Sequence, residues 1–231
     1  MDPSLTYAVL KDKQREIRDG FPENLALRTQ RAISWIGRAE QADDDDGKFI
    51  FLWIAFNAAY ADERDFQPEP PLARDSFRSY FGKVVALDAE KRIYNAIWEN
   101  FPRSIRLLMN NEFVYGPFWK HQNGIVGCED WENRFQQDLS YFNRIAVKQS
   151  DEHTIRTLAL LFDRLYVLRN QLLHGGATWD SKVNRNQVRD GAAILAFLIP
   201  VFVDVMMSHP GGDWGQPFYP VVSRNSAYSG V

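Results

Sequence analysis

The chain has 231 residues, 45% of them hydrophobic, and can therefore bury one large core or two small ones without disulfides or metals. Its single cysteine, Cys128, excludes an intramolecular disulfide and a multi-cysteine zinc site. A formal net charge of -3 gives no overall attraction for nucleic acid, so any nucleic-acid site must be a local patch.

The first predicted elements are two helices separated by an acidic break. Residues 24–41 place apolar side chains at helical spacing. The run DDDD at 43–46, followed by Gly47, predicts a solvated loop, with an ion site as the alternative. Residues 48–63 predict a second helix with a stripe of aromatic side chains. Three prolines within 67–73 end this part, because proline cannot continue a helix.

The middle of the chain predicts three more helices and one irregular segment. The helices are expected at about 74–86, 88–109 and 129–148. The aromatic, glycine-containing stretch 111–127 interrupts the helical pattern, and it predicts an irregular insertion in the bundle.

The clearest helix is expected at 151–176, where leucines recur at spacings of three and four. It begins on acidic residues, which favour the positive end of a helix dipole. Gly175 and Gly176 predict its end, since glycine readily adopts the left-handed conformation that closes a helix.

A last helix is predicted at 186–208, and Pro200 is expected to kink it. Its apolar run, 192–203, is too short to span a bilayer, so it predicts a buried helix of the core.

We expect these helices to form one all-α domain. Residues 210–231 are rich in glycine, proline and serine and predict a tail lying over the surface. No internal repeat or convincing linker divides the chain. The predicted domain is therefore 1–231, with the helical bundle at about 24–208.

Three polar side chains, Arg169, Asn170 and His174, occupy the end of the helix expected at 151–176. Asn170 and His174 are four residues apart and share one helix face. Arg169 lies about 140° from His174 around the axis, so the two side chains would not touch in a straight helix. If two copies met across a two-fold axis, each arginine could face the histidine of the other copy.

Such a cluster suits phosphoryl transfer on RNA. Arginine grips phosphate oxygens and stays charged at any working pH, and histidine can exchange a proton near neutral pH. With Asn170 orienting a partner or the substrate, a ribose 2′-hydroxyl could attack its own phosphate without a metal. The structural alternative is that Arg169 and His174 bond the free carbonyls at a helix C-terminus, which is a common arrangement.

The order of Arg169, Asn170 and His174 within LRNQLLHGG resembles the signature of the HEPN superfamily. In that signature an arginine, commonly followed by a polar residue, precedes a histidine a few positions later. The upstream stretch FLWIAFNAAY is also similar to an aromatic-rich helix that several branches carry. The resemblance covers about 24–208, and its specific part is 169–175.

The resemblance implies a compact helical bundle that forms a homodimer, joining two copies of the motif in one cleft. It implies a metal-independent endoribonuclease that leaves 2′,3′-cyclic phosphate and 5′-hydroxyl ends. On this mapping Arg169 and His174 are catalytic and Asn170 supports them. Many members are toxins of toxin–antitoxin pairs or act in antiviral defence against phage, so we expect RNA as substrate and a regulatory protein as partner.

Two departures within the superfamily bear on these expectations. Some members carry a tyrosine two residues after the histidine, which a partner nucleotidyltransferase modifies. This chain has Gly176 there, so that route of control is not expected. Other members have lost catalysis, so the alternative function is a non-catalytic module that binds RNA or a nucleotide or mediates dimerisation.

Four further residues are predicted to bind substrate: Asn57, Trp179, Lys182 and Arg185. Asn57 would face the same cleft as His174, and Trp179 would stack on a base. Lys182 and Arg185 would form a basic rim for the RNA backbone. The structural alternatives are a hydrogen-bonded core amide, a core ring and a solvated helix start.

The remaining expectations concern location and cofactors. The first residues lack the basic and apolar regions of a signal peptide, which favours a cytoplasmic protein. No Walker loop, dinucleotide fingerprint or zinc-protease helix occurs, so the sequence predicts no cofactor and no metal.

Overall fold

The computed structural model describes residues 5–61, 73–180, 182, 184–217 and 219–221. Over this part of the chain the secondary structure is helical and contains no β-strand, which confirms the predicted all-α class. The α-helices are α1 (Tyr7–Ile17), α2 (Glu23–Glu40), α3 (Asp45–Tyr60), α4 (Ala73–Leu87), α5 (Arg92–Asn95), α6 (Pro102–Met109), α7 (Gly116–Gln122), α8 (Trp131–Lys148), α9 (Asp151–Leu173) and α10 (Arg185–Ser208). Shorter helical turns are η1 (Arg18–Gly20), η3 (Ala96–Asn100) and η4 (Glu112–Val114).

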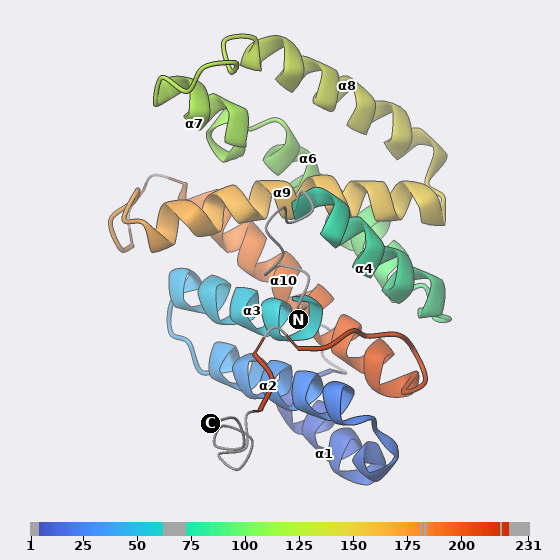
Figure 1. The fold of residues 1–231 in the computed structure, drawn as a ribbon. Helices are drawn as coiled ribbons and strands as arrows, with labels where there is room; N and C mark the ends of the chain where they lie inside the picture. The colour runs from blue at the N-terminus through green and yellow to red at the C-terminus, as the bar shows by residue number, and fades with distance from the viewer. Residues whose placement is uncertain (1–4, 62–72, 181, 183, 218, 222–231) are drawn as a thin grey trace, which may run out of the picture.

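Helix α10 forms the centre of the bundle. It packs on α2 and α3 on one side and contacts α4 and α9 on the other. Helix α1 packs along α2, while α7 and α8 lie beyond α9, away from α2 and α3 (Figure 1). From Ile194 to Met207 every side chain except Phe197 is buried. By length and composition α10 could cross a membrane, but 83% of its most apolar stretch is buried, as predicted for a core helix.

Aromatic side chains join four helices at the centre of the core. Phe56 of α3 and Phe81 of α4 both pack against Phe162 of α9, with ring centroids 4.5 Å and 4.8 Å apart. Phe81 also lies 5.8 Å from Phe202 of α10. All four rings are fully buried. Aromatic pairs of this kind add about 0.5–1.5 kcal/mol beyond the burial of their area, so this cluster holds α9 firmly against the other helices.

Two helical details differ from the sequence prediction. The single helix expected at 88–109 is divided into α5, the π-turn η3 and α6. Pro102 explains the break between η3 and α6, because it has no N–H and can begin a helix but not continue one, and α6 begins there. Helix α1 was not predicted. It buries only Leu10 and Gln14, too few apolar positions to show a helical period.

The start of the C-terminal segment is tied into the core, so the prediction of a tail lying over the surface is wrong here. Trp214 is buried, and its Nε1 donates to the His209 carbonyl at 2.9 Å. Arg28 of α2 is fully buried and donates to the Gln216 carbonyl at 2.7 Å and to the Ala61 carbonyl at 2.8 Å. A buried guanidinium group therefore holds the C-terminal segment against the end of α3.

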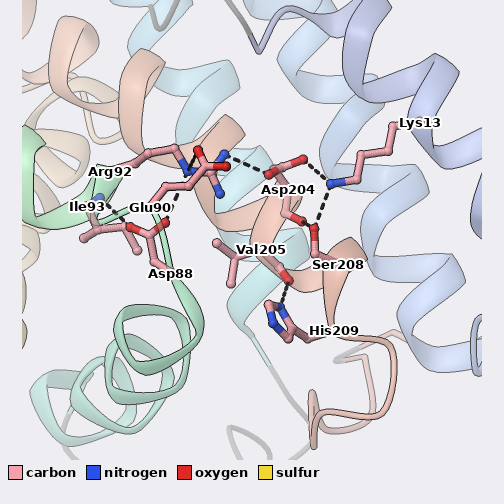
Figure 2. Close-up of polar contacts among 9 residues, drawn as sticks. All are labelled: Lys13, Asp88, Glu90, Arg92, Ile93, Asp204, Val205, Ser208 and His209. Atoms are coloured by element: carbon pink, nitrogen blue, oxygen red, sulfur yellow. Dashed lines mark hydrogen bonds and ion pairs between the residues drawn. The ribbon is translucent and has the colours of Figure 1, made fainter.

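A second polar cluster links α1, α10 and the chain entering α5 (Figure 2). Arg92 donates from Nη1 to Asp204 at 2.8 Å and from Nε to Asp88 at 3.2 Å. Lys13 Nζ lies 2.5 Å from the other Asp204 oxygen, and the Ile93 amide donates to Asp88 at 2.7 Å. Burial alone would lower the pKa of Arg92, but the hydrogen bonds and charges of Asp204 and then Asp88 raise it.

Candidate functional site

The end of helix α9 is built by two glycines that follow His174. Gly175 has a φ of +69°, and its amide donates to the Leu172 carbonyl at 3.4 Å. The Gly176 amide donates to the Gln171 carbonyl at 2.7 Å. These two bonds form a Schellman motif, which satisfies the free carbonyls of the last turn. Backbone amides therefore close α9 at the predicted place, and the exposed side chain of His174 is not needed for this task.

The two predicted catalytic side chains point to different surroundings. Arg169 is half-buried, and its Nη1 donates to Asn170 Oδ1 at 2.9 Å. Its guanidinium lies 6.0 Å from the Tyr166 ring centre, and its buried Nε has no hydrogen-bond partner. Within the described residues no hydrogen bond joins Arg169 to His174. Among the described residues, neither the Arg169 nor the His174 side chain bonds a carbonyl at the end of α9. This weighs against the alternative in which the two side chains only cap the helix.

His174 lies on a groove of about 1290 Å³ beside α9. Asn170 and Tyr166 lie on the same face of α9 and line the groove with it, as a spacing of four residues requires. The opposite wall comes from η4, α7 and α8, and includes Phe113, Trp119, Lys120 and Arg134. The stretch predicted as an irregular insertion thus contains short helices and forms one side of this groove.

The four residues predicted to bind substrate do not line this groove. Asn57 is partly buried in α3, and Lys182 is exposed. Trp179 is 76% exposed in the turn after α9. Arg185, at the start of α10, donates from Nη2 to both carboxylate oxygens of Asp46, at 3.0 Å and 2.9 Å. An RNA contact at Arg185 would have to compete with this ion pair.

Asp46 anchors the turn between His174 and α10, and sequence reasoning missed this role. Its Oδ2 accepts the Asp180 amide at 3.1 Å in addition to Arg185. The hydrogen bond that Arg185 donates to Asp46 raises the pKa of Arg185 above its ordinary value, despite partial desolvation. The solvated loop predicted at 43–46 is therefore wrong for Asp46, which is buried, and for Asp44, which caps α3 by accepting the Gly47 amide at 2.7 Å.

Replacing Asp46 with alanine should lower the free energy of unfolding by about 2 kcal/mol, because Arg185 and the Asp180 amide lose a charged hydrogen-bond acceptor. Urea unfolding measures this change. Asp43→Ala is the matched control, since it removes the same charge from an exposed neighbour. Equal unfolding midpoints for the two variants would show that Asp46 anchors nothing.

Among the described residues, no three His, Cys, Asp or Glu side chains gather in a group that could hold a metal ion. No protein-family model matches the chain, and no curated protein or solved structure compared with it matches either. The fold and site define an all-α protein with a histidine on an open groove. The resemblance to the HEPN superfamily rests on the sequence motif at 169–175 alone.

Proposed function

We propose that this protein is a metal-independent endoribonuclease of the HEPN type. The observation that carries the proposal is the position of His174, whose exposed imidazole lies on a groove beside Asn170 while glycine amides close its helix. A histidine in that setting is free to exchange protons with a bound molecule. Arg169 stands one residue before Asn170 and supplies a permanent positive charge.

The proposed reaction is transesterification within the RNA chain. The 2′-oxygen forms a bond to the adjacent phosphorus as the 2′-proton passes to a base, and the bond from phosphorus to the 5′-oxygen breaks. The leaving 5′-oxygen takes a proton from an acid. His174 serves in proton transfer and Arg169 stabilises the charge on the phosphate oxygens, which leaves a 2′,3′-cyclic phosphate and a 5′-hydroxyl.

The proposed active form is a homodimer. Arg169 is held by Asn170 and is absent from the lining of the groove that carries His174 in its own chain. An isologous two-fold contact between the ends of two α9 helices would bring Arg169 of one copy toward His174 of the other. The groove would then be completed by residues of both copies.

An RNA-cutting enzyme must be restrained in its own cell. We therefore propose a cytoplasmic toxin or phage-defence effector that a regulatory protein or an infection controls. Expression of the wild-type chain should arrest growth, and expression of Arg169→Ala should not. Equal toxicity of the two proteins would contradict this biological role.

The cleavage proposal is tested with purified protein and a panel of RNAs in EDTA. The wild type should cut, and Arg169→Ala and His174→Ala should not. Both variants should keep the wild-type melting temperature, because His174 is exposed and Arg169 is only half-buried. Cutting by all three preparations would indicate a contaminating nuclease and remove the site assignment.

The second candidate is a non-catalytic module that binds RNA or a nucleotide. What favours it is that Arg169 donates to Asn170 of its own chain and is not among the residues that line the groove. In that case the wild type should bind RNA without cutting any member of the panel. His174→Ala should then leave the affinity unchanged.

A further inference from the structure

The wall of the groove opposite α9 carries exposed aromatic rings in fixed positions. Phe113 is 47% exposed and Trp119 is 37% exposed. Trp119 Nε1 donates to the Phe113 carbonyl at 2.7 Å, and Gln171 of α9 donates to the same oxygen at 2.6 Å. Phe118 packs edge-on against both rings. The wall is thus tied to α9, and its rings would lose little freedom on binding a ligand.

Cationic side chains lie beside these rings. Lys120 and Arg134 line the groove and are exposed, and neither forms an ion pair among the described residues. Deeper in the groove, the Arg164 guanidinium stacks over Tyr115 at 4.3 Å. The two carboxylates of the lining belong to Asp138 and Asp163. Asp138 accepts the Tyr115 hydroxyl at 3.3 Å. The lining therefore holds three cationic side chains, Lys120, Arg134 and Arg164, against two carboxylates.

Rings and cations in this arrangement fit a single-stranded polynucleotide. Aromatic side chains stack on exposed base faces, while lysine and arginine neutralise the phosphates. In an RNA duplex the base faces are covered by their neighbours, so the rings could not reach them. Tyr166, 41% exposed on α9, gives the facing wall a third ring next to Asn170.

We propose that residues 113–120, together with Arg134, form a base-stacking subsite for single-stranded RNA. The subsite holds nucleotides next to the phosphate that His174 and Arg169 act on, and this placement rests on the proposed ribonuclease function. Trp119 is its central residue, and Lys120 contacts the backbone. The segment that interrupts the helical pattern of the sequence thereby sets the preference for unpaired RNA.

The test uses the full-length protein and a fluorescently labelled 2′-O-methyl oligoribonucleotide, which lacks the 2′-hydroxyl nucleophile and cannot be cut by the proposed reaction. Fluorescence anisotropy gives the Kd for the single strand and for the same strand annealed to its complement. Trp119→Ala should weaken binding of the single strand by roughly 5- to 150-fold, the range that base–aromatic stacking gives. Trp119→Phe should keep most of the affinity because it keeps a ring.

Tyr7→Ala is the matched control, since Tyr7 of α1 is 39% exposed, close to the 37% of Trp119, and does not line the groove. A Trp119→Ala protein that melts like the wild type but binds the strand equally well would overturn the proposal. Equal losses in Trp119→Ala and Tyr7→Ala, or a duplex bound as tightly as the single strand, would overturn it too. If Trp119→Ala fails to fold, Trp119→Leu keeps an apolar side chain but removes the ring: weaker binding of the single strand supports the subsite, and an affinity equal to that of the wild type contradicts it.

Cleavage of the corresponding unmodified strand separates this proposal from the proposed function. Binding that depends on Trp119 without any cutting would keep the subsite and reject the ribonuclease. Cutting that depends on His174 but proceeds equally well in Trp119→Ala would keep the ribonuclease and reject the subsite.

Discussion

Replacing Arg92 with methionine is expected to lower the free energy of unfolding by about 3 kcal/mol, as for removal of one partner from a buried ion pair. Arg92 stands between Asp88 and Asp204, whose side chains are 2% and 9% exposed. Without the guanidinium, Lys13 is the cationic partner that Asp204 keeps among the described residues, and Asp88 keeps the Ile93 amide (Figure 2). Urea unfolding followed by circular dichroism measures the loss.

Lys91→Met is the matched control for this prediction. Lys91 also pairs with an aspartate, Asp151, at 2.6 Å, but both side chains are about half exposed, 52% and 50%. Water screens such a pair, so its loss should cost less than about 1 kcal/mol. Similar losses for the two variants would show that burial does not set the strength of the Arg92 cluster.

The proposed dimer predicts that two inactive variants restore each other. Arg169→Ala should reduce cleavage by about 10²- to 10³-fold through loss of charge stabilisation, and His174→Ala by about 10²- to 10⁴-fold through loss of proton transfer. Co-expressed with different tags and purified together, the two variants should recover roughly a quarter of wild-type activity, since half of the dimers are mixed and each mixed dimer has one intact Arg169–His174 pair.

The control for this experiment is a chain that carries both substitutions, co-expressed with the wild type. Its mixed dimers contain no site with both Arg169 and His174 unless the two act within a single chain. A mixture of the single variants that stays as inactive as each variant alone would show that one chain must supply both residues, and the two-fold site would be rejected.

The sequence predicted the fold where local patterns are strong. The leucine period of α9 and its Gly175–Gly176 end are local signals, and the structure closes the helix there with two backbone bonds. Helix α1 lacked such a signal because most of its side chains face solvent. Contacts between distant parts of the chain could not be predicted either. The buried Arg28 of α2 donates hydrogen bonds to the carbonyls of Ala61 and Gln216, about thirty and 190 residues further along the chain.

The candidate site was predicted only as far as one helix reaches. Asn170 and His174 share a groove because they are four residues apart on α9. The opposite wall, with Trp119 and Lys120, depends on how residues 111–123 fold back on α9, and no local spacing encodes that approach. The contact of Asp46 with Arg185 likewise spans 139 positions and appears only in the folded chain.

The most direct measurement of the central claim is the chemical identity of the RNA ends that the wild-type protein produces in EDTA. The proposed transesterification predicts a 2′,3′-cyclic phosphate on one fragment and a 5′-hydroxyl on the other, because the 2′-oxygen is the nucleophile. Fragments with a 3′-hydroxyl and a 5′-phosphate would instead identify water as the nucleophile, and would contradict the role assigned to Arg169 and His174.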